Sequence, residues 1–165
     1  MTFQIDPMLP SDWPAVREIY LEGIATREAT FETGAPSWEA WDASHSSFGR
    51  LVARENETVV GWAALSPVSS RQAYAGVAEV SVYVTQNQRG LGLGRRLLEA
   101  LIAESESNGI WSLQAVMFPE NTSSVALHQS CGFREVGRRK RIAMLDGLWR
   151  DTILLERRSQ QIGID

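Results

Sequence analysis

The sequence has one cysteine, no long apolar run and no excess of positive charge, and each shortage excludes a class of protein. Cys131 alone can form no intramolecular disulfide, which fits a reducing compartment, and its favoured interpretation is a small core residue. The longest apolar stretch, VVGWAAL at 59–65, is far shorter than the ~20 residues that span a bilayer. The first residues, MTFQIDPMLP, lack the basic start and apolar run of a signal peptide. These absences predict a cytoplasmic protein.

Charge and composition limit the function further. The net charge of −4 argues against a general nucleic-acid binder. One basic run, GRRKR at 137–141, is best interpreted as a solvated strand face, with nucleic acid or an acidic ligand as the alternative. A chain of 165 residues with 44% apolar and 22% charged residues suits one globular domain with one core.

Apolar periodicity predicts the order ααβββαβαββ, an α/β (α+β) domain around one sheet. Helical spacing marks two early helices, after which β-rich runs form a hairpin and a Val- and Tyr-rich strand. The later elements are a helix ended by Asn108-Gly109, a strand, a short helix and two strands joined by Asp146-Gly147, a hairpin signal. The segments before the late hairpin are 10–25, 37–48, 50–65, 78–84, 93–107, 111–118 and 120–133, and segment 26–36 is a loop.

A glycine-rich loop, RGLGLGR at 89–95, follows strand 78–84 and opens the next helix. Helix N-termini present unpaired N–H groups, and glycines let a phosphate approach the backbone closely. The dinucleotide fingerprint G-x-G-x-x-G is excluded because position 95 is Arg, and no Walker A string exists. The remaining pattern, R-x-x-G-x-G, predicts a phosphate cradle, with a plain glycine-rich turn as the alternative.

This R-x-x-G-x-G loop resembles the pyrophosphate loop of the GNAT superfamily of N-acetyltransferases. PENTSSVALHQSCGF at 119–133 resembles the family's later signature, an Asn-led helix ending in Gly-Phe. The resemblance implies a single GNAT domain over 1–165, with helices flanking a central mixed, mostly antiparallel sheet and a V-shaped opening beside strand 78–84. It assigns to acetyl-CoA the residues Val82, Tyr83, Val84, Arg89, Gly90, Leu91, Gly92, Leu93, Gly94, Arg95, Asn121 and Ser124.

Four shorter stretches narrow the resemblance to one group within the GNAT superfamily. RQAY at 71–74, AEVSVYV at 78–84, ALH at 126–128 and DGLWRD at 146–151 together resemble the phosphinothricin and methionine sulfoximine N-acetyltransferases. TREATFET at 26–33 is similar to that group's substrate-covering loop, and many other GNAT enzymes carry Tyr where this chain has His128.

The narrower resemblance implies acetyl transfer from acetyl-CoA to the α-amino group of a small amino-acid-like substrate, by direct attack in a ternary complex. It also implies a homodimer that needs no metal and binds neither nucleic acid nor membrane. Two alternatives stay open. One is acetylation of another amine, such as a protein N-terminus, a polyamine or an antibiotic. The other is an acetyl-CoA-binding sensor without catalysis.

Two residues are catalytic candidates. Glu79 interrupts an apolar strand and would act as general base if it faces the cleft; an outward-facing strand residue is the alternative. His128 could carry a proton or hydrogen-bond the substrate, whereas His45 is expected at the surface. The substrate-binding candidates are Phe31, Arg71, Gln72, Ala73 and Tyr74. Arg71 could fork onto a carboxylate, whereas an acidic pocket without an inward Arg71 would favour another amine.

Overall fold

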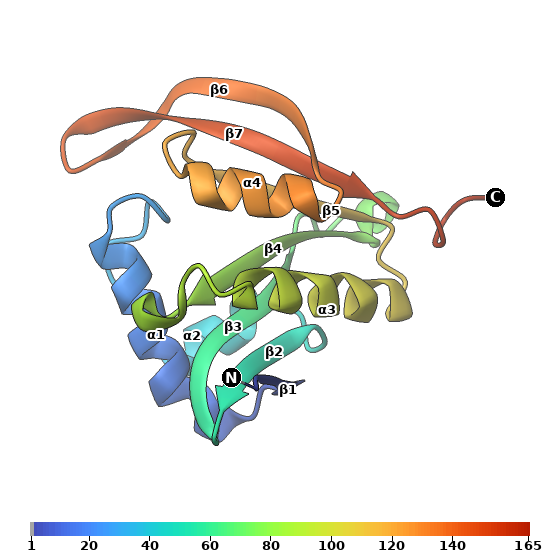
Figure 1. Ribbon diagram of the computed structural model, residues 1–165. Coiled ribbons are helices and arrows are strands. Elements are labelled where there is room, and N and C mark those ends of the chain that lie inside the picture. The colour runs from blue at the N-terminus through green and yellow to red at the C-terminus, as the bar shows by residue number, and fades with distance from the viewer. Residues whose placement is uncertain (1) are drawn as a thin grey trace.

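The computed structural model describes residues 2–165, which form one seven-stranded sheet with helices packed on its two faces (Figure 1). The strand order is β1-β2-β3-β4-β5-β7-β6, and every neighbouring pair is antiparallel except β4 with β5. The predicted mixed, mostly antiparallel sheet is therefore confirmed. The strands are β1 (Gln4–Pro7), β2 (Arg50–Glu55), β3 (Thr58–Pro67), β4 (Val77–Val84), β5 (Ser112–Met117), β6 (Arg134–Leu145) and β7 (Leu148–Arg158).

The helices divide between the two faces of the sheet. They are α1 (Trp13–Ala25), α2 (Trp38–Ser44), α3 (Leu93–Ser107) and α4 (Thr122–Ser130). Leu51 and Ala53 pack in the core cluster that includes α3, while Val52 between them packs with α1 and α2. Alternate residues of a strand point to opposite faces, so the central strands are buried on both sides. This explains why β3 reads as a nearly continuous apolar run.

Local turn chemistry sets the element boundaries largely where the sequence predicts them. Ser37 caps α2, because its hydroxyl accepts a hydrogen bond from the Ala40 N–H at 3.2 Å. Asp146 and Gly147 have φ of 51° and 78°, the pair of positive angles that a tight two-residue hairpin needs. Gly109, after α3, has φ of 79° and ends the helix in the left-handed conformation.

The predicted order ααβββαβαββ is wrong at its start, because it lacks β1. This edge strand has only four residues, too few for a period-2 pattern to stand out. It is joined to its surroundings by Arg54 of β2, which lies 3.1 Å from Asp6 and makes two 2.8 Å hydrogen bonds to Asp12. The Arg54 hydrogen bonds lower the pKa of Asp12.

The parallel pair β4–β5 holds together over only three residue pairs, from Val77–Ser112 to Glu79–Gln114. Beyond Glu79, residues 80–84 of β4 pair with β3, while residues 115–117 of β5 pair with β7. The two strands therefore part at Glu79 and form the V-shaped opening that the family resemblance implies. Within residues 2–165, no helix has the length and apolar character required to cross a membrane.

Candidate active site

A cavity of about 1160 Å³ occupies the region where β4 and β5 part. Its wall is built from β4, the glycine-rich loop, α4 and the segment between α1 and α2. Of the residues that the sequence analysis names, the wall contains Phe31, Glu79, Val82, Tyr83, Val84, Arg89, Gly90, Gly92, Leu93, Gly94, Arg95, Asn121, Ser124 and His128. Leu91 and the four residues 71–74 do not line it.

The glycine-rich loop leaves an open cradle at the start of α3. Gly90 and Gly92 both have φ of +80°, and a Cβ added at either would meet no atom within 4 Å. The first four N–H groups of an α-helix have no partner within it and carry partial positive charge. Gly94 has another reason for its lack of a side chain, since a Cβ there would lie 3.2 Å from Leu127 of α4. The loop therefore fits an anionic group such as a diphosphate.

Two arginines add positive charge at this end of the cavity. Arg89 is exposed, and its Nε donates to the Val84 carbonyl at 3.3 Å. Arg95 pairs with Glu99 one helical turn later, at 2.7 Å between Nε and Oε1. Among the described residues of the wall, these are the only Arg or Lys side chains. The glycine-rich end is thus suited to an anion by both its backbone and its charge.

Glu79 is the last residue of β4 that pairs with β5 and stands at the apex of the opening. Its side chain is half-buried in the cavity wall, so the outward-facing alternative is wrong. Gln114 of β5 donates its side-chain amide to Oε1 of Glu79 at 2.8 Å and fixes the carboxylate. A carboxylate has two oxygens and several acceptor sites, so Glu79 keeps capacity to accept a proton or an N–H bond.

His128 of α4 is 5% exposed and lines the same cavity. Its Nδ1 lies 2.8 Å from the Ser124 carbonyl. A carbonyl can only accept, so Nδ1 carries the hydrogen and Nε2 of the neutral ring is an acceptor. Burial lowers the pKa of His128, which keeps the ring neutral near pH 7.

The wall also contains two aromatic residues that the sequence analysis does not name, Tyr20 and Trp62, and both contact the predicted site residue Tyr83. Trp62 stacks on Tyr83 with ring centroids 4.9 Å apart, and Tyr20 lies 5.0 Å from Tyr83. Burial raises the pKa of both phenols. The expectation of a surface position for His45 is wrong, because His45 lines the cavity and stacks on Trp41 with ring centroids 3.9 Å apart. Its spacing of four residues from Trp41 was the available signal.

Arg71 and its neighbours lie on an exposed turn. Residues Gln72–Tyr74 form a single turn of 3-10 helix, and the Arg71 guanidinium lies 5.8 Å from the ring centroid of Tyr74. A single chain therefore does not bring these residues into the cavity wall. The charged residues in the wall away from the glycine-rich loop are acidic: Glu28, Glu32 and Glu79. Within residues 2–165, no three His, Cys, Asp or Glu side chains are grouped to hold a metal ion.

Comparison with known proteins places this geometry in a family. The model of the acetyltransferase (GNAT) family matches residues 11–133. The chain belongs to this family. It is therefore an acetyl-CoA-dependent N-acetyltransferase.

Individual GNAT relatives resemble the chain over most of its length. A phosphinothricin N-acetyltransferase of Alcaligenes faecalis is 34% identical over 153 residues, covering 88% of this chain and 77% of that relative. An L-methionine sulfoximine/L-methionine sulfone acetyltransferase of Pseudomonas paraeruginosa is 29% identical and covers 88% of each chain. A crystal structure of a phosphinothricin acetyltransferase from Sinorhizobium meliloti with acetyl-CoA has a TM-score of 0.90 at 29% identity, covering 100% of this chain and 92% of that one.

Proposed function

We propose that this GNAT enzyme, acting as one domain over residues 1–165, acetylates the α-amino group of a small amino-acid-like acid. Methionine sulfoximine and phosphinothricin are the model substrates, because relatives named for them cover most of the chain. The observation that carries the proposal is the position of Glu79 in the wall of the cavity, at the apex of the opening. A base there can receive the proton that the attacking amine must lose.

Acetyl-CoA would be held by two surfaces of this chain and would supply the activated acetyl thioester. The N–H groups of residues 90–95 fit its diphosphate, which explains why Gly90 and Gly92 are open to the cavity. The edge of β4 at residues 82–84, which pairs with β3 alone, leaves backbone groups for the pantetheine arm, and Asn121 and Ser124 lie in the same cavity wall.

The chain's own residues then promote direct attack by the amine. Glu79 accepts the ammonium proton, a role that contributes typically ~10²–10⁴-fold. His128 presents Nε2 as an acceptor and can orient the amine. A thiolate with a reference pKa of ~8.5 departs without a strong acid. Holding two substrates side by side lowers the barrier further, and no covalent enzyme intermediate is needed.

A homodimer is also part of the proposal. The β6–β7 hairpin exposes large apolar side chains that an isolated chain would leave in water: Val136, Ile142, Met144, Leu148 and Trp149. An apolar patch of this kind typically marks an interaction surface.

A second candidate substrate class is an amine without a carboxylate. The wall beyond the glycine-rich loop contains Glu28, Glu32 and Glu79, while Arg71 lies outside it. Carboxylates attract an ammonium group and repel a substrate carboxylate. This arrangement favours a cationic acceptor such as a polyamine.

A thiol-release assay with acetyl-CoA separates the two candidates. The panel contains methionine sulfoximine, methionine sulfone, phosphinothricin, free amino acids and spermidine. If Arg71 holds the substrate carboxylate, Arg71→Ala should lower kcat/KM for the amino-acid substrates by about 10- to 100-fold, the range that corresponds to one charge-assisted hydrogen bond. Faster turnover of spermidine than of methionine sulfoximine would instead support the second candidate, and equal loss on both substrates in Arg71→Ala would show that Arg71 does not hold the substrate carboxylate.

A further inference from the structure

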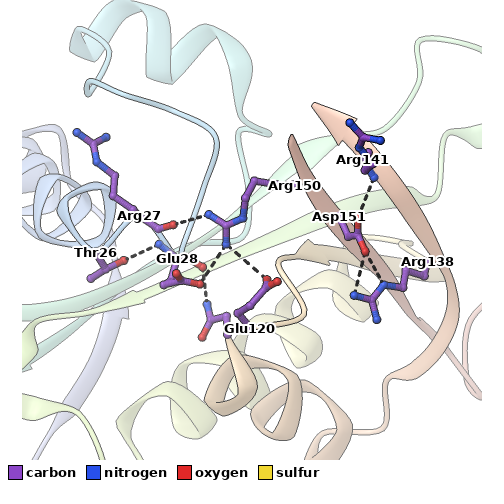
Figure 2. A network of polar contacts seen from close by, with 9 residues as sticks. Thr26, Arg27, Glu28, Glu120, Arg138, Arg141, Arg150 and Asp151 are labelled. Atoms are coloured by element: carbon purple, nitrogen blue, oxygen red, sulfur yellow. Dashed lines mark hydrogen bonds and ion pairs between the residues drawn. The ribbon is translucent and has the colours of Figure 1, made fainter. Parts of the chain in front are cut away.

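Arg150 of β7 joins two walls of the active-site cavity that are distant in sequence (Figure 2). Its Nη1 donates to the Arg27 carbonyl at 3.0 Å, and its Nη2 lies 3.2 Å from the Glu28 carboxylate. The same Nη2 lies 3.4 Å from Glu120, in the turn between β5 and α4. The side chain of Arg150 is 15% exposed, whereas those of its partners Glu28 and Glu120 are 48% and 55% exposed.

The guanidinium also reaches the cavity through two aromatic rings. Its central carbon lies 4.0 Å from the ring centroid of Phe118, a buried residue that follows β5. Phe118 in turn contacts Phe31 edge-on, with centroids 4.9 Å apart, and Phe31 lines the cavity. A guanidinium over an aromatic face is attractive. Arg150 therefore packs on Phe118, which in turn packs against Phe31.

Asn121, a candidate acetyl-CoA ligand, belongs to the same contact group. Its side-chain amide donates to the Glu28 carbonyl at 3.2 Å. Glu28 is thus held by Arg150 through its carboxylate and by Asn121 through its carbonyl. Glu28 therefore links Arg150 to a candidate acetyl-CoA ligand.

The loop that carries Glu28 and Phe31 is bordered by a small pocket and contains a residue with an unfavourable backbone angle. A second cavity of about 40 Å³ lies beneath it, lined in part by Thr30, Phe31 and Phe118. Arg27 has φ of 58°, the left-handed region that non-glycine residues rarely adopt. The polar contacts of Arg150 and Asn121 therefore add to the packing that positions the loop.

The hairpin that supplies Arg150 is itself braced on its other face. Asp151 accepts a 2.8 Å bond from the backbone N–H of Arg141 and a 2.9 Å bond from Nε of Arg138 (Figure 2). These bonds span the irregular pairing between residues 139 and 143 of β6. Neighbouring strand residues point to opposite faces, so Asp151 fixes the hairpin while Arg150 faces the loop.

We propose that Arg150 is a positioning residue for acetyl transfer. It holds segment 26–32 against the Glu120–Asn121 turn, and so sets the position of Phe31 beside the amine and of Asn121 beside acetyl-CoA. The kinetic part of this proposal rests on the proposed function.

The test compares Arg150→Met with Arg138→Met, a matched control on the same hairpin. Arg138 also pairs with a carboxylate, Asp151, but on the face away from the cavity. Both proteins are assayed for kcat and KM with methionine sulfoximine, for acetyl-CoA affinity by calorimetry, and for backbone hydrogen exchange over residues 26–32.

We expect Arg150→Met to lower kcat/KM for the amine by about 10- to 100-fold, the scale of a small misplacement of reacting groups. Exchange over 26–32 should accelerate, and acetyl-CoA affinity should fall by a smaller factor than kcat/KM. Arg138→Met should leave all three close to native, because Asp151 keeps its 2.8 Å bond from the Arg141 backbone N–H and the hairpin stays braced. Arg150→Lys should recover only part of the loss, because Lys lacks the planar fork.

The proposal is overturned if Arg150→Met behaves like Arg138→Met, or if its loss of activity merely follows a loss of folded protein. If Arg150→Met does not fold, the variants Glu28→Gln and Glu120→Gln each remove the charge of one exposed partner of Arg150. Unchanged hydrogen exchange over residues 26–32 in both variants would also overturn the proposal. If the native enzyme is inactive on methionine sulfoximine, the proposed substrate fails, and the exchange data alone then decide the role of Arg150.

Discussion

Substitution of Gly92 by Ala tests the diphosphate cradle most directly. Gly92 has φ of +80° at the N-terminus of α3, and an added Cβ would project into open space. An L-residue in this left-handed conformation costs about 1–2 kcal/mol. For a chain of this size, that cost corresponds to a drop of about 2–8 °C in Tm.

Binding should weaken beyond what this backbone strain explains. The Cβ would occupy the space that a phosphate needs to reach the loop N–H groups. Losing one charge-assisted hydrogen bond costs about 1.5–3 kcal/mol, which is about 10- to 100-fold in the Kd for acetyl-CoA.

Gly109→Ala is the matched control for this change. Gly109 ends the same helix with φ of +79°, and a Cβ there also meets nothing within 4 Å, but it lies outside the cavity. Both variants should show a similar fall in Tm, and only Gly92→Ala should lose acetyl-CoA affinity by calorimetry. Equal affinities in the two variants would refute the cradle.

Glu79, the proposed base, and the two imidazoles with lowered pKa give two further tests. Glu79→Gln should lower kcat by ~10²-fold or more with little change in acetyl-CoA affinity, and near-normal kcat across the pH range would remove Glu79 from the mechanism. Burial lowers the pKa of His128 and His45, so the unfolded chain binds more protons than the folded one as pH falls through ~6.5, until the folded rings are protonated as well. The unfolding free energy in urea should therefore fall as pH drops from 7 toward 5. His128→Gln should flatten this slope, and an unchanged slope would contradict its burial as a neutral ring.

The sequence predicts well the structural features that depend on a few adjacent residues. The strand–R-x-x-G-x-G–helix order locates the cradle, and Asp146-Gly147 locates the last hairpin, because each depends on a few adjacent residues with restricted backbone angles. β1 escaped prediction for the opposite reason. It is stabilised by pairing with β2 and by Arg54, some 48 residues away from Asp6.

Reasoning from adjacent residues cannot predict the part of the cavity wall that lies away from the glycine-rich loop. Tyr20, Trp62 and His45 belong to different elements and meet only once α1 and α2 pack on the sheet. Likewise, the nearness of Arg71 to β4 in sequence says nothing about whether its side chain points inward. The contact between Arg150 and Glu28 joins residues 122 positions apart.

Because β4 and β5 pair over only three residue pairs, the sheet consists of two parts that are joined over a short length. Strands β1 to β4 form one half and β5 to β7 the other, joined in the sheet by three residue pairs. A ligand that contacts both β4 and α4 spans the β4–β5 junction on the side where the two strands part. Saturation with acetyl-CoA should therefore slow hydrogen exchange at the paired residues of β4 and β5, 77–79 and 112–114, as well as at the amides that acetyl-CoA contacts.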